Sequence, residues 1–159
     1  MELNSSAHLN KRIDSVIGEI NHHHQKQLDL CLRLERVADS LPDNIDRQEC
    51  LSISWQIYPI VKEAHRFEEE TLFPLLSMEK SENSTLSNSL ERLKFEHWED
   101  ESSAEDISLS LRQMISEPAS ANVEKISYML RGFFEGLRRH IAFETDHLLA
   151  KLDNLKTAN

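Results

Sequence analysis

The chain has 159 residues, a length typical of one domain, and we expect that domain to span residues 1–159. It carries 18 Lys and Arg against 28 Asp and Glu, which gives a formal net charge of -10. This balance argues against partners such as nucleic acids and anionic membranes, because both attract basic proteins. Only three glycines and four prolines occur, a composition that argues against a β-rich fold and favours helices.

The sequence contains no sign of export or membrane insertion. Its apolar runs are too short to cross a bilayer, and residues 1–14 lack the apolar segment of a signal peptide. Cys31 and Cys50 lie too far apart for a C-x-x-C motif, so neither a zinc ribbon nor a redox pair is indicated. Reduced cysteines suit the cytoplasm, which is the location we predict.

Three short polar breaks, at residues 41–44, 81–84 and 117–120, divide the chain into four segments of similar length. Each segment is about 30 residues or slightly longer, enough for a helix on the order of 45–50 Å. Asp46, Ser84 and Ser120 are suitable N-caps for the last three helices. Four long helices with short loops predict an all-α fold, an up-down-up-down antiparallel four-helix bundle.

In each segment, apolar residues recur every three or four positions and define one face of an amphipathic helix. In the first segment, His24 interrupts the apolar series Ile13, Ile17, Ile20, Leu28, Cys31, Leu34 and Ala38. In the second, His65 and Glu69 interrupt the series Leu51, Trp55, Tyr58, Leu72 and Leu76.

The third and fourth segments repeat this arrangement. In the third, His97 and Glu101 lie within the series Leu86, Leu90, Leu93, Ala104, Leu111 and Ile115. In the fourth, His140 and Glu144 follow Ile126, Leu130, Phe133 and Leu137, and the next position on that face is His147 or Leu148.

Three segments therefore carry a His-x-x-x-Glu pair whose two side chains share the core-facing side of a helix. A single pair of this kind is most often a structural surface pair, but three pairs in phase with three apolar faces favour a common site. Burying carboxylates and imidazoles in a bundle core is costly unless something compensates their charge. A pair of metal ions would do so, and imidazole with carboxylate suits iron, zinc or manganese.

The spacing of these residues distinguishes the site from other metal motifs. The His-Glu-x-x-His motif of zinc proteases is absent, and the Glu-x-x-His motif of ferritin-like sites is reversed here. The stretch His65-Arg-Phe-Glu-Glu-Glu-Thr-Leu-Phe-Pro74 is similar to the H-x-x-x-E-E-x-x-L-F-P pattern of the hemerythrin-like, or HHE cation-binding, family. The stretch His140-Ile-Ala-Phe-Glu144 resembles the second H-x-x-x-E of that family, and Glu96-His97 resembles its third-helix E-H.

The resemblance implies a non-haem di-iron centre in the bundle core that binds O2 or NO, or that senses or stores iron. By analogy, Glu69 and Glu144 bridge two Fe ions, for which Mn or Zn are substitutes. The remaining ligands are His24 and His65 on one ion, and His97, Glu101 and His140 on the other. Glu101 replaces a histidine of the oxygen carriers, and this anionic ligand is expected to favour ferric iron over reversible O2 carriage.

Several alternatives stay open. Within His22-His23-His24, the spacing favours His24 over His23 as the ligand, and His147 is an additional candidate. We expect Glu68 and Glu70 to face solvent. No general base, nucleophile or phosphate loop is evident, so a gas-binding or metal-binding protein is favoured over an enzyme. The rival functions are a metal-free helical module that binds a partner protein, and a di-iron oxidase or peroxidase.

Overall fold

The structure is a computed structural model that describes residues 2–78 and 84–157. The first long helix is α1 (Glu2–Ser40), and the second is α2 (Arg47–Phe67), which continues through the π-helix η1 (Glu68–Leu72) into α3 (Phe73–Ser77). The third is α4 (Ser84–Ser116). The fourth is α5 (Val123–Phe143), which continues through the π-helix η3 (Glu144–Leu149) into α6 (Ala150–Thr157).

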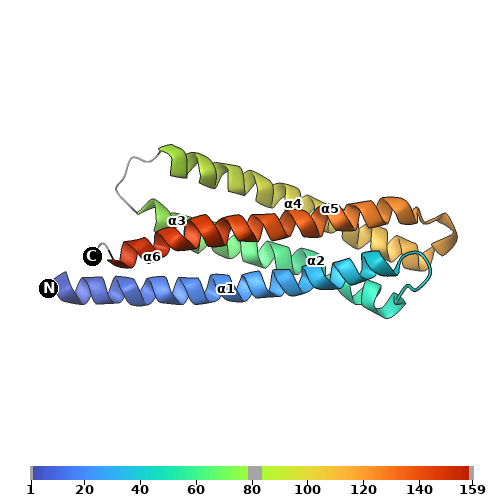
Figure 1. Cartoon of the computed structure of the whole chain (residues 1–159), viewed down its shortest axis with the longest axis horizontal. Coiled ribbons are helices and arrows are strands. Elements are labelled where there is room, and N and C mark those ends of the chain that lie inside the picture. Colours follow the sequence, from blue (N-terminus) through green and yellow to red (C-terminus); the bar gives the residue numbers. More distant parts are fainter. Residues whose placement is uncertain (1, 79–83, 158–159) are drawn as a thin grey trace.

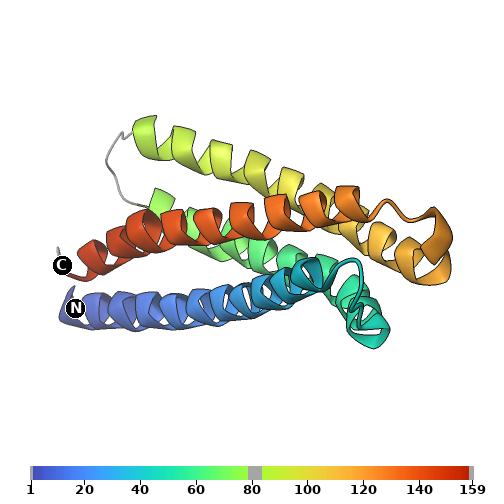
Figure 2. The same cartoon turned by 45° about the vertical axis from the view of Figure 1, so that its right-hand side comes forward.

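These four rods lie alongside one another and alternate in direction, as Figures 1 and 2 show. Helices α2 and α4 pack together, as do α1 and α5, and the two ends of the chain lie at the same end of the bundle. The predicted all-α four-helix bundle is therefore confirmed. Within the described residues, no helix combines the length and the apolar character needed to cross a membrane.

The helix starts follow from their capping residues. Asp46 caps α2 as predicted, because its Oδ1 accepts a hydrogen bond of 3.0 Å from the backbone N–H of Glu49. The prediction that Ser120 caps the last helix is wrong. Pro118–Ser120 forms a short 3₁₀-helix instead, and the Asn122 side chain accepts from the Lys125 N–H. Ser84 begins α4, but the residues just before it lie outside the described part of the chain.

The apolar core has two parts, which we call the loop-side cluster and the terminus-side cluster. The loop-side cluster is built from α1, α2, α4 and α5 and includes Leu34, Ile57, Leu111, Leu130 and Phe134. The terminus-side cluster lies toward the chain ends and includes Ile20, Leu72, Leu75, Leu93 and Leu148. His24, His65 and His97 fall between residues of the two clusters, and His140 lies at the edge of the loop-side cluster, directly before Ile141. A polar layer therefore divides an otherwise apolar core.

The start of α2 is rotated relative to the sequence prediction. Leu51 and Trp55 were expected on the core face, but they are 43% and 64% exposed. The buried positions of that stretch are Cys50, Ile53, Ser54 and Ile57. Trp55 lies on the surface, where its ring stacks beneath the guanidinium of Arg112, with the guanidinium carbon 4.4 Å from the ring centroid.

Removing the cap of α2 should weaken the fold by a modest amount. We expect Asp46→Ala to lower the free energy of unfolding by about 1 kcal/mol, because the Glu49 N–H loses its acceptor. Urea unfolding followed by circular dichroism measures this change. Asp43→Ala is the matched control, since Asp43 is exposed in the preceding turn and its replacement should change stability by less than about 0.5 kcal/mol.

Candidate metal centre

Four histidines, one from each rod, meet in the polar layer. His24, His65, His97 and His140 are all buried, with exposed fractions between 1% and 7%. Three of the rings are stacked almost parallel. The centroids of His65 and His97 are 3.9 Å apart, and those of His97 and His140 are 5.1 Å apart. The sequence prediction that these four residues converge agrees with the structure.

Glu144 lies at the centre of this group and is 1% exposed. Its Oε2 lies 2.8 Å from Nε2 of His24, and its Oε1 lies 2.7 Å from Nε2 of His140. Oε1 is also 3.8 Å from Nε2 of His97. The two oxygens of one carboxylate therefore face histidines of different helices. Burial alone would raise the pKa of Glu144, but the contacts with His140, His24 and His97 outweigh it and hold the pKa well below its usual range.

Glu68 is a second buried carboxylate of the layer, and the expectation that it faces solvent is wrong. Its side chain is 1% exposed, and its Oε2 lies 2.9 Å from Nε2 of His97. Burial and the neighbouring charge of Glu144 raise its pKa to about 8. The signal for its role was the alternating spacing of Val61, His65, Glu68 and Leu72, which follows the buried face of this rod more closely than Glu69 does.

Glu69 and Glu101 lie behind the histidine rings and not between them. Oε1 of Glu69 is 2.7 Å from Nδ1 of His97, and the Glu69 side chain is 39% exposed. Oε1 of Glu101 is 3.2 Å from Nδ1 of His65, and its Oε2 is 2.8 Å from Nζ of Lys62. The structure thus assigns both carboxylates a contact with the outer ring nitrogen. Their assignment as direct metal ligands stays a prediction.

Asp100 completes this pattern, and the sequence analysis missed it. Its Oδ2 lies 3.3 Å from Nδ1 of His140. His65, His97 and His140 therefore each have a carboxylate at Nδ1, while Nε2 faces the polar layer. Metal-ligating histidines in proteins have this arrangement, because the outer carboxylate orients the ring and increases its basicity. Asp100 directly precedes Glu101 and lies outside the apolar series of its segment, so the periodicity did not indicate it.

The donor atoms of the layer fit a bound cation. One group comprises His65, His97 and His140, and a second comprises Glu68, His97, His140 and Glu144; in each group the donor atoms lie within 4.8 Å of one another. Nε2 of His65 is buried without a hydrogen-bond partner, and Nε2 of His97 and Oε2 of Glu68, although 2.9 Å apart, are not aligned for a hydrogen bond. Buried polar atoms without partners are costly, and coordination to a cation would satisfy all three.

The protonation of the histidines differs with their surroundings. Burial, followed by the neighbouring His97 and His140, lowers the pKa of His65 to about 2, so its imidazole is neutral. Burial also opposes the charged form of His97 and His140. Hydrogen bonds that the two imidazoles donate to carboxylates outweigh that effect and raise their pKa values to about 9 and about 10. A cation would therefore displace protons from these two rings on binding.

Two further histidines lie outside the layer. His23 is buried, but it packs against the ring of Phe67 with centroids 5.3 Å apart. His24 alone of the two makes the contact with Glu144, in agreement with the preference for His24. His147 is exposed and packs against Phe143, because Leu148 occupies the buried position of that turn.

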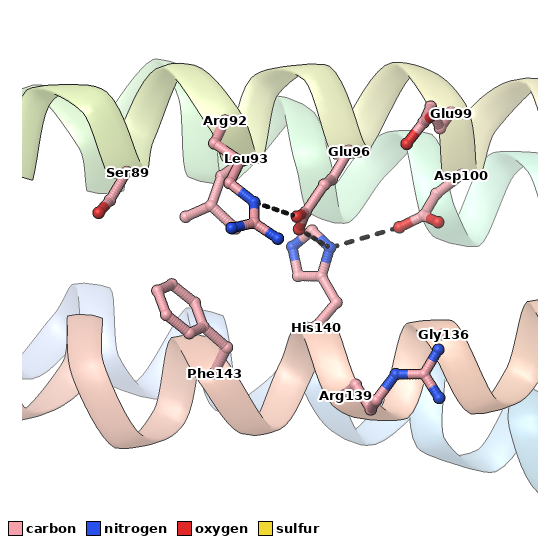
Figure 3. A pocket seen from close by; sticks show the side chains of 10 residues that line it. All are labelled: Ser89, Arg92, Leu93, Glu96, Glu99, Asp100, Gly136, Arg139, His140 and Phe143. Carbon is pink, nitrogen blue, oxygen red and sulfur yellow. Dashed lines mark hydrogen bonds and ion pairs between the residues drawn. The ribbon is translucent and has the colours of Figure 1, made fainter.

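A cavity of about 570 Å³ between α4 and α5 leads from the surface toward this layer. Figure 3 shows the ring of His140 at its inner wall, with Asp100 and Glu96 of α4 facing the ring. Arg92, Arg139 and Phe143 line other parts of the cavity. Of the four clustered histidines, the lining of this cavity includes His140.

Comparison with known protein families decides the identity of the fold. The model of the hemerythrin HHE cation-binding domain matches residues 15–152. The chain belongs to this hemerythrin family. Comparison with curated proteins and with solved structures finds no significant match. Membership explains why a bundle core contains four imidazoles and two buried carboxylates, since the hemerythrin HHE domain is a cation-binding domain.

The two adjacent glutamates of η1 should differ in their importance for metal binding. We expect Glu68→Gln to lose at least half of the bound iron after anaerobic loading with ferrous iron, because Glu68 lies among the inner donor atoms. Glu69→Gln should keep the stoichiometry and weaken affinity by about 10- to 100-fold, since it acts through His97. Metal analysis after dialysis measures both, with the exposed Glu70→Gln as control. Full iron in Glu68→Gln with loss in Glu69→Gln would contradict the assignment.

Proposed function

We propose that the polar layer holds two iron ions and binds a small diatomic ligand, O2 or NO, or serves to sense or store iron. The observation that carries this proposal is the position of Glu144. Its two oxygens face His24 on one side and His140 on the other, as a carboxylate that bridges two ions would. A site for a single ion would need only one of these two sets of partners.

The number of inner donors also supports two ions. Four imidazoles and two buried carboxylates converge, and the two donor groups overlap only in His97 and His140. A single four-coordinate site needs fewer ligands than this, and imidazole with carboxylate suits iron. His24, His65, His97, His140, Glu68 and Glu144 would hold the ions, with manganese or zinc as chemical substitutes.

The protein's part is to position donors and control access. Glu69, Asp100 and Glu101 fix the ring orientation of three histidines through Nδ1. The loop-side and terminus-side clusters keep bulk water from both ends of the layer. Bound iron would supply an open coordination position and one-electron chemistry. The α4–α5 cavity gives ligands a path to the His140 side of the site (Figure 3).

Two other functions make different predictions. A metal-free module that binds a partner protein would retain no metal after expression in iron-replete medium. An oxidase or peroxidase would consume O2 or peroxide in proportion to a named reductant. The unpartnered donor atoms favour metal binding over the first. An oxidase or peroxidase would use the same metal site, so only turnover distinguishes it from the proposed function.

Metal content and colour test the proposal directly. We expect about two irons per chain in the purified protein and a visible spectrum that changes on reduction and on addition of O2 or NO. His65→Ala and His140→Ala should lose the colour and most of the iron. Both should also lose the added thermal stability that bound metal gives, because binding to the folded state is linked to folding.

His147→Ala is the matched control, because His147 is exposed outside the layer. Its iron content and spectrum should equal those of the unaltered protein. Absence of metal in the unaltered protein, with no stability change in His65→Ala, would favour the partner-binding module. A stable and fully reversible oxygenated form would contradict the expectation that Glu101 disfavours O2 carriage.

A further inference from the structure

Gln27 is a buried amide that the proposed ligand set does not use. Its side chain is 1% exposed, and its Oε1 has no hydrogen-bond partner. Two buried serines of the core are satisfied locally, since Ser54 and Ser108 each donate to a carbonyl of their own helix, at 2.7 and 2.8 Å. A buried amide oxygen without a partner is costly, so the presence of Gln27 needs another explanation.

The position of Gln27 on α1 places it at the polar layer. It follows His24 by three residues and His23 by four, so it shares the inward face of the helix with both. Helical side chains lean toward the N-terminus of their helix, which directs the long Gln27 side chain back over the turn that carries His24.

The contacts between α1 and α5 set the level of Gln27 along the bundle. His24 contacts Glu144, and the Cys31 thiol lies 3.6 Å from the carbonyl oxygen of Phe134. Because the helices are antiparallel, Gln27 lies between these contacts and opposite the turn of α5 that contains His140. The amide is thus bracketed by His24 on its own helix and His140 on the facing helix.

We propose that Gln27 is a specificity-determining residue whose amide hydrogen-bonds the exogenous ligand at the metal centre. This inference rests on the proposed function, because it assumes that the layer binds metal and an added ligand. A neutral amide both donates and accepts, so it suits a small ligand with lone pairs, or a bound water in its place. In the protein without ligand the amide oxygen has no partner, which is a stability cost kept for binding.

Azide binding to the iron-loaded, oxidised protein tests the proposal. In Gln27→Met, which keeps the length of the side chain, azide affinity should fall about tenfold, as expected for the loss of one buried hydrogen bond. The azide stretching frequency should shift, and the iron content should not change. The metal-free Gln27→Met protein should unfold at the same or a higher urea concentration than the unaltered protein, because an unsatisfied amide is removed.

Gln25→Met is the matched control, since Gln25 lies on the exposed side of α1 and bonds Asp29. It should leave azide affinity and stretching frequency unchanged. Unchanged azide binding in Gln27→Met overturns the role of Gln27 while leaving the iron site intact. Loss of iron in Gln27→Met also overturns it, because the amide would then hold the metal. Failure of the unaltered protein to load iron instead overturns the proposed function.

Discussion

The fold depends on one constraint, the burial of ionisable groups between two apolar clusters. His65, His97, Glu68 and Glu144 are each 1% exposed, so water cannot solvate their charges or lone pairs. In such surroundings every donor atom needs a partner, and an unpaired one is costly. The positions of the four rods are therefore set by polar contacts as well as by apolar packing. The same contacts produce a polar, ionisable site between two apolar parts of the core.

Two π-helices lie at the polar layer. Each begins at a buried glutamate, Glu68 in η1 and Glu144 in η3. Leu72 and Leu148 follow these glutamates by four residues, so each glutamate and its leucine share one side of the helix. The glutamates face the histidines, and the two leucines enter the terminus-side cluster. Single π-turns of this kind are frequent at functional sites.

Much of the bundle was predictable from the sequence, because apolar spacing and few breaks determine four helices. The histidines were predictable for the same reason, since each interrupts an apolar face. The choice between Glu68 and Glu69 was harder, because adjacent positions differ by only about 100° around a helix. The contact of Asp100 with His140 and the position of Trp55 beneath Arg112 both involve a neighbouring helix. The spacing of residues within one helix does not predict such contacts.

The charge of the layer suits the binding of cations. Six carboxylates lie within ion-pair distance of the four histidines: Glu68, Glu69, Glu96, Asp100, Glu101 and Glu144. Within the described residues, two basic side chains form ion pairs with members of this set, Lys62 with Glu101 and Arg92 with Glu96. With neutral imidazoles this leaves four negative charges, which two divalent ions balance.

Protons are the alternative way to balance the same charge. The raised pKa values of Glu68, His97 and His140 show that the layer takes up protons when no cation compensates it. Cations and protons therefore compete for the same negative groups, and loading the site requires proton release. Substituting apolar residues throughout the layer would remove both the competition and its cost, and with them the buried donor groups that can hold a cation.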